Sequence, residues 1–246
     1  MLMEHLLRTI QPFLLGAVFL LIYLAEHIYP QRKQHALSRH DFRNFGIGIF
    51  NAALTFAGGY GFQLVITSLS RHHVGLFNLI ELPFYISLPA QILLLDIFMY
   101  WWHRINHIIP FLWQFHHFHH IDEEMNSTTA LRFHAVELSL SYVAKLLVFP
   151  FFGFSLTAIL LYGLLFLPVV ILHHSNISIR ESLDLRLRKL IVTPHMHRIH
   201  HSAKYVETNS NYSSVFPWWD RLFRSYRKYP SGVIRFGVDE RPRKPA

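Results

Sequence analysis

The sequence contains no cysteine. Disulfide bonds, zinc sites with thiolate ligands and cysteine nucleophiles are therefore excluded. Any metal site in this chain has to be built from histidines and carboxylates. The lack of cysteine does not identify a cellular compartment, so it restricts the chemistry and leaves the location open.

Charged residues are scarce as well. They make up 15% of the 246 residues, against 52% hydrophobic residues and a mean hydropathy of +0.25, whereas a soluble domain carries about 25% charged residues. Long apolar runs lie near residues 10–29, 45–69, 84–102 and 138–172. A run of about 20 residues crosses the hydrocarbon core of a bilayer as a helix. Pro150 and Gly153 divide the last run and predict a helical hairpin. We therefore expect an all-α integral membrane bundle of four to five spans, forming a single domain over residues 1–246.

The loops between these runs differ in positive charge. The loop after the first run carries Arg32, Lys33, Arg39 and Arg43, whereas the loop after the second carries only Arg71. Because positively charged loops stay in the cytoplasm, this difference places the first loop inside and the second outside. The third run then returns to the cytoplasmic side where the histidine-rich segments begin. The first run is followed by "EHIYPQRK" rather than by small residues, which predicts an uncleaved anchor.

The net charge of +8 comes from the end of the chain. From Arg180 onward there are 14 Lys/Arg and 6 Asp/Glu, so this segment alone carries 14 − 6 = +8. No nucleic-acid-binding motif accompanies the charge, so we expect no nucleic-acid partner. A basic segment after membrane spans is typical of contact with anionic lipid headgroups. It could also dock an acidic partner protein, but headgroups are the favoured interpretation.

Histidines, unlike cysteines, are abundant in this sequence. Thirteen of the 19 lie between His103 and His201. Three groups within this stretch have helical spacing: "HRINH" (His103, His107), "HHFHH" (His116, His119, His120) and "HRIHH" (His197, His200, His201). Residues three and four apart share one face of a helix. Each group can therefore direct two or three imidazoles at one point, which predicts metal binding.

Asp96 extends the first group. Asp96, Tyr100, His103 and His107 follow i, i+4, i+7, i+11 spacing within an apolar run. An ionisable residue inside a membrane segment is costly and usually functional. We expect its carboxylate to accept the second N–H of a ligand histidine and so orient the ring. The competing interpretation is a partner for a basic residue such as Arg104.

Eight grouped histidines exceed what one catalytic zinc ion needs, which is three ligands and an open position. They suit two metal ions, and imidazole ligands favour iron, zinc, copper or nickel. Spacing alone does not choose between these metals. A non-enzymatic metal transporter or sensor is the main alternative to an enzyme. A zinc hydrolase is less favoured because HExxH is absent.

Six separated blocks carry a resemblance to a known family. They are "DIFMYWWHRINH", "LWQFHHFHH", "EEMNSTTALRFHAVE", "HHSNI", "TPHMHRIHHS" and "NYSSVFPWWDRLF". In this order they resemble the fatty acid hydroxylase / sterol desaturase superfamily, and within it the bacterial branch similar to alkylglycerol monooxygenase. The resemblance covers roughly Asp96 to Phe223. It implies a non-haem di-iron oxidoreductase, a hydroxylase or desaturase that uses O₂ and external electrons.

The resemblance also implies site residues and partners. The implied metal ligands are His103, His107, His116, His119, His120, His174, His197, His200 and His201, with His134 less secure. His117, His173 and His195 are additional histidines without an assigned role. The implied cofactor is a pair of iron ions, which zinc can replace in purified protein.

No GxGxxG motif is present, so electrons are expected from a donor protein or a small reductant. The implied location is the bacterial inner membrane, with the metal site on the cytoplasmic side. The expected substrate is a fatty acyl chain, a glyceryl ether or a sterol-like lipid that reaches the metals from the bilayer. Candidate lining of its cleft comes from five phenylalanines, although helix packing is the favoured role for any one of them: Phe98, Phe149, Phe151, Phe152 and Phe166.

Overall fold

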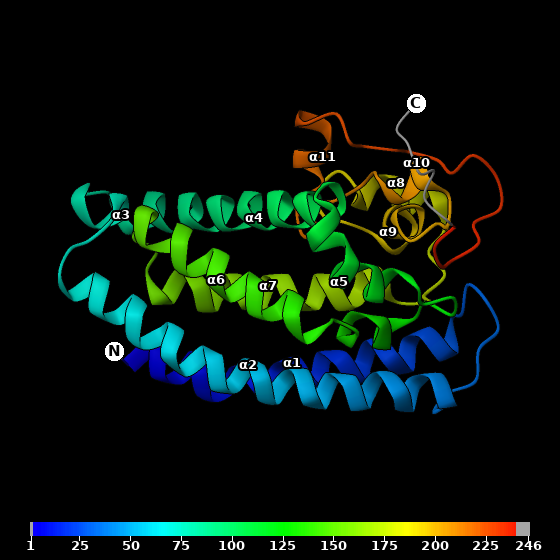
Figure 1. Ribbon diagram of the computed structural model, residues 1–246, viewed down its shortest axis with the longest axis horizontal. Helices are drawn as coiled ribbons and strands as arrows, with labels where there is room; N and C mark the ends of the chain where they lie inside the picture. The colour runs from blue at the N-terminus through cyan, green and yellow to red at the C-terminus, as the bar shows by residue number, and fades with distance from the viewer. Residues whose placement is uncertain (1, 240–246) are drawn as a thin grey trace.

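A computed structural model describes residues 2–239. Over these residues the chain is helical, and its only β pairings are two isolated bridges, Pro30 with Ile177 and Ser202 with Phe236. Long helices form an elongated bundle, and all the shorter elements except one, which lies at the opposite end, gather at one end of it (Figure 1). The all-α fold expected from the sequence is confirmed.

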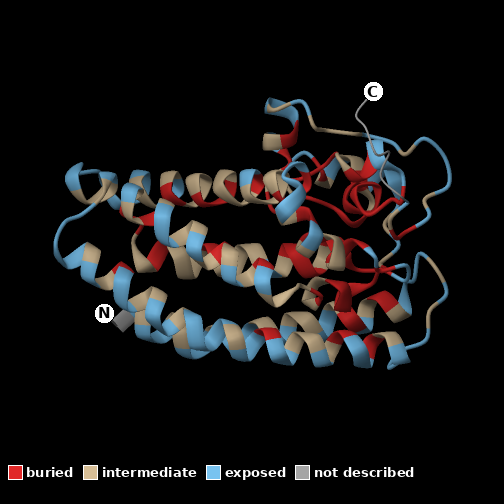
Figure 2. Cartoon of the chain, viewed as in Figure 1, coloured by how far each residue is buried: buried red, intermediate tan, exposed pale blue. Residues whose placement is uncertain are grey.

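Five of the described helices are long and apolar enough to cross a membrane. They are α1 (Leu2–Ile28), α2 (Arg39–Arg71), α4 (Phe84–Ile108), α6 (Ala135–Phe152) and α7 (Leu156–His174). Their outward faces carry exposed apolar side chains, for example Phe13 and Phe56, which are 78% and 84% exposed. In Figure 2 the buried residues concentrate at the end with the short elements, while the long helices are largely exposed. This distribution fits helices whose outer faces contact lipid.

The turn between α6 and α7 explains the hairpin expected for residues 138–172. Gly153 ends α6 in the left-handed conformation at φ +68°, and the Ser155 side chain caps α7 by accepting from the Ala158 N–H. A second glycine, Gly75, packs against this turn just before the short helix α3 (Leu76–Leu79). A Cβ on Gly75 would lie 2.3 Å from the Gly153 nitrogen. Only glycine permits this close approach of two backbones.

The remaining elements form a cap at the opposite end of the bundle from α3 (Figure 1). They are α5 (Pro110–His120), the 3₁₀ helix η1 (Ser127–Leu131), α8 (Glu181–Leu187), α9 (Pro194–His200), α10 (Tyr205–Thr208) and α11 (Trp218–Leu222). The carboxyl ends of α4 and α7 lead into this cap.

α4 is longer than the apolar run that predicted it. The run ends at Trp102, but the helix continues to Ile108, which adds about 1.7 turns and includes His103 and His107. The tryptophans mark the end of the apolar composition. The helix itself ends only just before Pro110, because a proline disfavours the α conformation in the residue that precedes it. The first histidine pair therefore sits on a continuous membrane helix.

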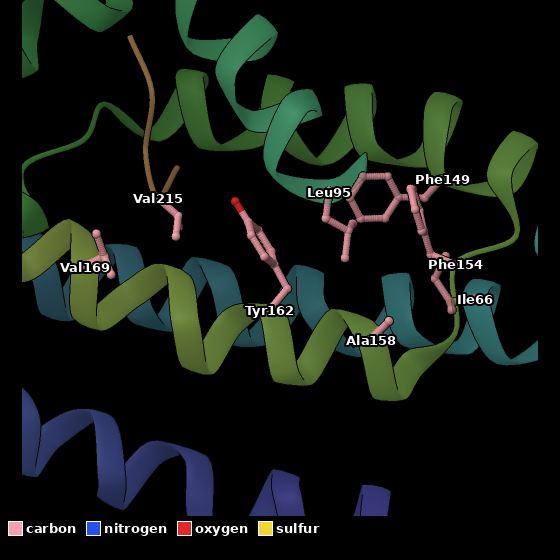
Figure 3. Packing of buried hydrophobic residues seen from close by; sticks show 8 residues of the cluster. All are labelled: Ile66, Leu95, Phe149, Phe154, Ala158, Tyr162, Val169 and Val215. Atoms are coloured by element: carbon pink, nitrogen blue, oxygen red, sulfur yellow. The ribbon is translucent and has the colours of Figure 1, made fainter. Parts of the chain in front are cut away.

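The apolar core lies between α2, α4, α6 and α7 (Figure 3). Its buried members are Ile66, Leu95, Phe149, Phe154, Ala158, Tyr162, Val169 and Val215. Phe98 packs on this core with its ring centroid 5.3 Å from that of Phe149. Val215 comes from the cap, so the same core fixes the cap to the membrane helices.

A buried polar network joins the cap to α1 and α2. Glu26 accepts from the Ser127 hydroxyl at 2.6 Å and from the Asn176 N–H at 2.8 Å. Asp122 contacts the His40 ring at 2.8 Å and accepts from Thr129 at 2.8 Å. Burial opposes ionisation of Asp122, but these hydrogen bonds and the charge of His40 outweigh it and lower its pKa to about 2. The network thereby holds the segment that follows the second histidine group.

Candidate metal centre

The histidines of the first two groups come from α4 and α5. His103 and His107 lie on the last turns of α4, and His116, His119 and His120 lie on α5. Pro110 begins α5 directly after α4 ends, and the two helices pack against each other. The change of direction at this proline brings the HxxxH and HxxHH faces together.

The remaining histidines arrive from α7 and α9. His174 is the last residue of α7. α9 begins with Pro194 at its first turn and with the Thr193 side chain accepting from the Met196 N–H, both of which favour a helix start. This short helix packs against α7. It thus presents the "HRIHH" histidines to the same place.

These residues form two groups that could each hold a metal ion. One has five histidines: His103, His107, His116, His120 and His200. The other has four: His119, His174, His197 and His201. Within each group the ligand nitrogens lie within 4.8 Å of one another. Two nitrogens that each bind one zinc-like ion at about 2.1 Å can be at most about 4.2 Å apart. The histidine side chains would therefore need to move only a little to bind a metal ion.

Hydrogen bonds behind the rings fix their orientation. The Nδ1 of His103 donates to the Tyr212 carbonyl at 2.7 Å, and that of His200 donates to the Ser210 carbonyl at 2.7 Å. In the four-histidine group, His119 Nδ1 donates to the Arg132 carbonyl and His174 Nδ1 to the Val170 carbonyl. A carbonyl can only accept, so Nδ1 carries the proton and Nε2 is left as the metal-binding atom.

The chemistry of these rings fits a metal ion. Buried ring nitrogens of His120, His200 and His201 have no hydrogen-bond partner, and such atoms are costly unless they bind something. Burial lowers the pKa of His200 to about 3 and lowers the pKa values of His120 and His201 well below the usual range. The imidazoles are therefore neutral, which is the form that ligates a metal.

His134 does not lie with the other ligand candidates. It precedes α6, and its Nδ1 accepts from the Val136 N–H at 3.2 Å. Its ring packs on Phe115 and Phe118. The ligand role expected for it is thus not what the geometry shows; His134 acts as the N-cap of α6.

Asp96 also has a different role from the expected one. It is fully buried and accepts from the Tyr162 hydroxyl at 2.7 Å, the Trp219 indole at 2.7 Å and the Phe216 N–H. These donors occupy both carboxylate oxygens, and His103, the next histidine along α4, donates to a backbone carbonyl instead. Asp96 therefore connects α4 to α7 and to the cap rather than orienting a histidine.

Glu137, and not Asp96, is the carboxylate that contacts a candidate ligand histidine. Its Oε1 accepts from His116 Nδ1 at 2.8 Å, and both side chains are buried. Its other oxygen, Oε2, has no hydrogen-bond partner. The sequence contained a signal for it, since Glu137 is an ionisable residue at the start of an apolar run. That signal did not reveal which histidine it would meet.

Removing this carboxylate should weaken metal binding. We expect Glu137→Ala to lower metal affinity by about 10- to 100-fold, the usual cost of losing a group that orients a ligand histidine. Glu137→Gln keeps an acceptor oxygen and should lose less. Metal retained against a chelator, titrated for each variant, measures the effect. Glu81→Ala, at an exposed position before α4, is the control, and equal retention in all variants would contradict the role.

His173 joins the centre although the sequence gave it no role. It is buried, and its ring stacks on that of His197 at 3.9 Å between centroids. It is in neither ligand group. His117 and His195 are likewise outside both groups.

An apolar cavity of about 440 Å³ adjoins the centre. His103, His116, His119, His174 and His197 line one part of it. The rest lies between α2, α4, α6 and α7, with apolar lining from Met99, Leu138, Phe166, Leu167 and Val170. Among the phenylalanines expected from the sequence only Phe166 lines it; Phe98 and Phe149 are in the core, and Phe151 is 73% exposed. Phe166 therefore has the lining role, whereas Phe98 and Phe149 have the packing role that the sequence favoured.

A helical membrane bundle with two buried histidine groups and an apolar cavity beside them defines a class of histidine-rich membrane metal proteins. The fatty acid hydroxylase family model matches residues 88–225, more than half of the chain, and the chain belongs to this family. The matched segment includes both histidine groups, and the recognition made from the sequence blocks is confirmed.

Several curated proteins are similar to this chain. Alkylglycerol monooxygenase of Homo sapiens is 30% identical over 140 residues, which is 56% of this chain and 30% of that protein. Ornithine lipid hydroxylase OlsE of Rhizobium tropici is 29% identical over 133 residues, 54% of this chain and 39% of that protein. The chain thus spans about a third of the length of these relatives. No solved structure matches it.

Proposed function

We propose that this protein is a membrane-bound oxygenase that hydroxylates or desaturates a lipid-like substrate with O₂ and externally supplied electrons. The observation that carries the proposal is the contact between the two histidine groups and an apolar cavity between membrane helices. The family, and relatives named for lipid hydroxylation and alkylglycerol monooxygenation, support it.

The cofactor we propose is a pair of iron ions, one in each histidine group. Bound there, iron would supply O₂ activation and oxidation of a C–H bond, a chemistry for which imidazole-rich sites with open positions are suited. In the hydroxylation, R–H, O₂, two electrons and two protons give R–OH and water. Zinc, which has no redox chemistry, would occupy the same ligands without activity.

The chain itself binds and orients the substrate and excludes water from the site. Met99, Phe166 and Val170 provide apolar contacts for a hydrocarbon chain beside the histidines. Exclusion of water protects reactive species from side reactions. Hydroxylation and desaturation differ in which hydrogens lie near the metals, so the shape of this cavity decides between them. We also propose that residues 1–246 act as one domain.

The decisive test is oxygen transfer. Protein reconstituted in vesicles with iron, a reductant and lipid extracts should give products heavier by one oxygen atom or lighter by two hydrogens, and label from ¹⁸O₂ should enter any alcohol. Zinc-loaded protein is the matched control and should be inactive. Turnover without oxygen, or tight iron binding without any O₂ consumption, would contradict the oxygenase and favour a metal transporter or sensor.

The orientation in the membrane is a separate prediction. Among the described residues, the loop after α1 and all the cap elements lie at the histidine end, and α3 lies at the other (Figure 1). From the loop charges we propose that the histidine end faces the cytoplasm and that the membrane is the bacterial inner membrane. In intact cells, Lys228→Cys should resist an impermeant thiol reagent, whereas Val74→Cys should react. The chain has no native cysteine to interfere, and the reverse labelling pattern would refute the orientation.

A further inference from the structure

Lys145 is a charged side chain far from either end of a membrane helix. It lies ten residues after Ala135, where α6 begins, and seven before Phe152, where α6 ends. At 1.5 Å per residue these separations are about 15 Å and about 10 Å along the axis. α6 runs from the cap toward the end that holds α3 (Figure 1). Lysines in such a position are rare and are functional candidates by default.

The ammonium of Lys145 is directed along α6 toward the histidine end. Its Nζ lies 5.4 Å from the centroid of the Tyr142 ring, one turn nearer the histidine end. A lysine that extends along a helix to the lipid headgroups would turn toward the closer end of the helix, which here is Phe152. The side chain of Lys145 instead lines the cavity beside the metal centre.

No carboxylate neutralises this charge within residues 2–239. Within these residues the ammonium contacts only the Tyr142 ring. The Tyr142 hydroxyl donates to the Thr55 carbonyl at 3.2 Å. A charge withdrawn from water without a partner is strongly unfavourable. Lys145 is only partly exposed, and Glu137, the carboxylate that lines the same cavity, contacts His116 instead. The structure therefore contains a cation in a largely apolar cavity without a counter-ion among the described residues.

The cavity also indicates what kind of anion would fit. Lys145 is the one lysine or arginine among its lining residues, and most of that lining is apolar. One ammonium balances one negative charge, as on a carboxylate. Phosphate groups are typically bound by several donors or by the planar fork of arginine, and this cavity offers no arginine.

We infer that Lys145 binds the carboxylate of an amphiphilic substrate and thereby sets which carbon of its chain reaches the metal centre. This inference rests on the proposed oxygenase function. Eight residues separate Lys145 from Glu137, the partner of His116, which corresponds to about 12 Å along α6. A hydrocarbon chain anchored at Lys145 would place carbons far from its carboxylate, not those next to it, beside the histidines.

Binding can be measured without turnover. Purified protein in detergent is titrated with hexadecanoate, its uncharged methyl ester and hexadecyl phosphate, each competing with a fluorescent fatty acid. Wild type should prefer hexadecanoate over the ester by at least about tenfold, because a desolvated charge pair is lost with the ester. Lys145→Gln and Lys145→Met should abolish the preference, and Lys145→Arg should retain most of it. Lys189→Met removes an exposed lysine outside the cavity and should change nothing.

The outcomes distinguish a failure of carboxylate binding by Lys145 from a failure of the proposed oxygenase function. A preference that survives in Lys145→Gln, or a wild type that binds the ester equally well, overturns the role of Lys145 even if lipid oxidation is observed. A stronger preference for hexadecyl phosphate overturns the carboxylate. A preference lost only in the charge-removing variants supports the anchor even if no oxidation is found. Where oxidation is found, loss of the charge should also spread the product over more chain positions.

Discussion

Replacing His119 or His200 by alanine is expected to abolish lipid oxidation and to remove metal from one group of histidines. His200 belongs to the five-histidine group and His119 to the four-histidine group. Each variant removes one ligand nitrogen directly, so the loss of affinity at the affected group should exceed the roughly 10- to 100-fold cost of losing an outer partner. Metal analysis of protein purified from iron-supplemented cells should fall from two ions per chain toward one.

His117→Ala is the matched control for this experiment. His117 is on the same helix as His116 and His119 but belongs to neither group, so its removal should leave metal content and turnover close to wild type. Spectroscopy adds a second readout, because the signal of two coupled iron ions requires both groups to be filled. Full metal content and full turnover in His119→Ala and His200→Ala would overturn the assignment of the metal centre.

Replacing Asp96 by alanine is expected to have the largest effect on stability. The substitution leaves the Tyr162 hydroxyl, the Trp219 indole and the Phe216 N–H without their acceptor in a buried place. Each unsatisfied buried donor costs about 1–3 kcal/mol, so the three together should cost at least about 3 kcal/mol. Because Phe216 and Trp219 belong to the cap, the cap should separate from α4 and α7 first.

Thermal unfolding in detergent and limited proteolysis measure this effect. We expect a lower midpoint for Asp96→Ala and faster cleavage between α9 and α11, with Asp96→Asn intermediate because an amide oxygen still accepts. Bound metal should slow the cleavage, since the cap supplies three of the ligand candidates through α9. An Asp96→Ala protein as stable as wild type, with an intact cap, would show that Asp96 does not connect these parts.

The histidine groups could be found from the sequence because their geometry is local. The spacing of His116, His119 and His120, and of His197, His200 and His201, puts each set on one face of a helix. α5 is helical at the first set, and α9 includes His197 and His200 and has His201 as its C-cap. The membrane helices could be found for a similar reason, since apolar composition over about 20 residues is a property of each segment by itself.

Contacts between distant segments could not be predicted from the sequence. Asp96 and Glu137 are both acidic residues in apolar runs, and helix spacing favoured Asp96 as the partner of a histidine. The partner is Glu137, because α6 packs beside α5 and brings Glu137 to His116 across 21 residues of chain. Asp96 faces the cap 120 residues later in the chain. Periodicity within one helix carries no information about which neighbouring helix its face will meet.

The sequence by itself determined the class of this protein: a helical membrane bundle, without thiol chemistry, whose histidines are spaced for metal binding. Composition and helical periodicity suffice for that, since each acts over a few turns of chain. Only the tertiary structure decided how the histidines divide into two groups, that His134 caps a helix, and that Lys145 shares a cavity with the metal centre. Those facts depend on how α4, α5, α6, α7 and α9 pack against one another, and packing is fixed by the burial of all of them together.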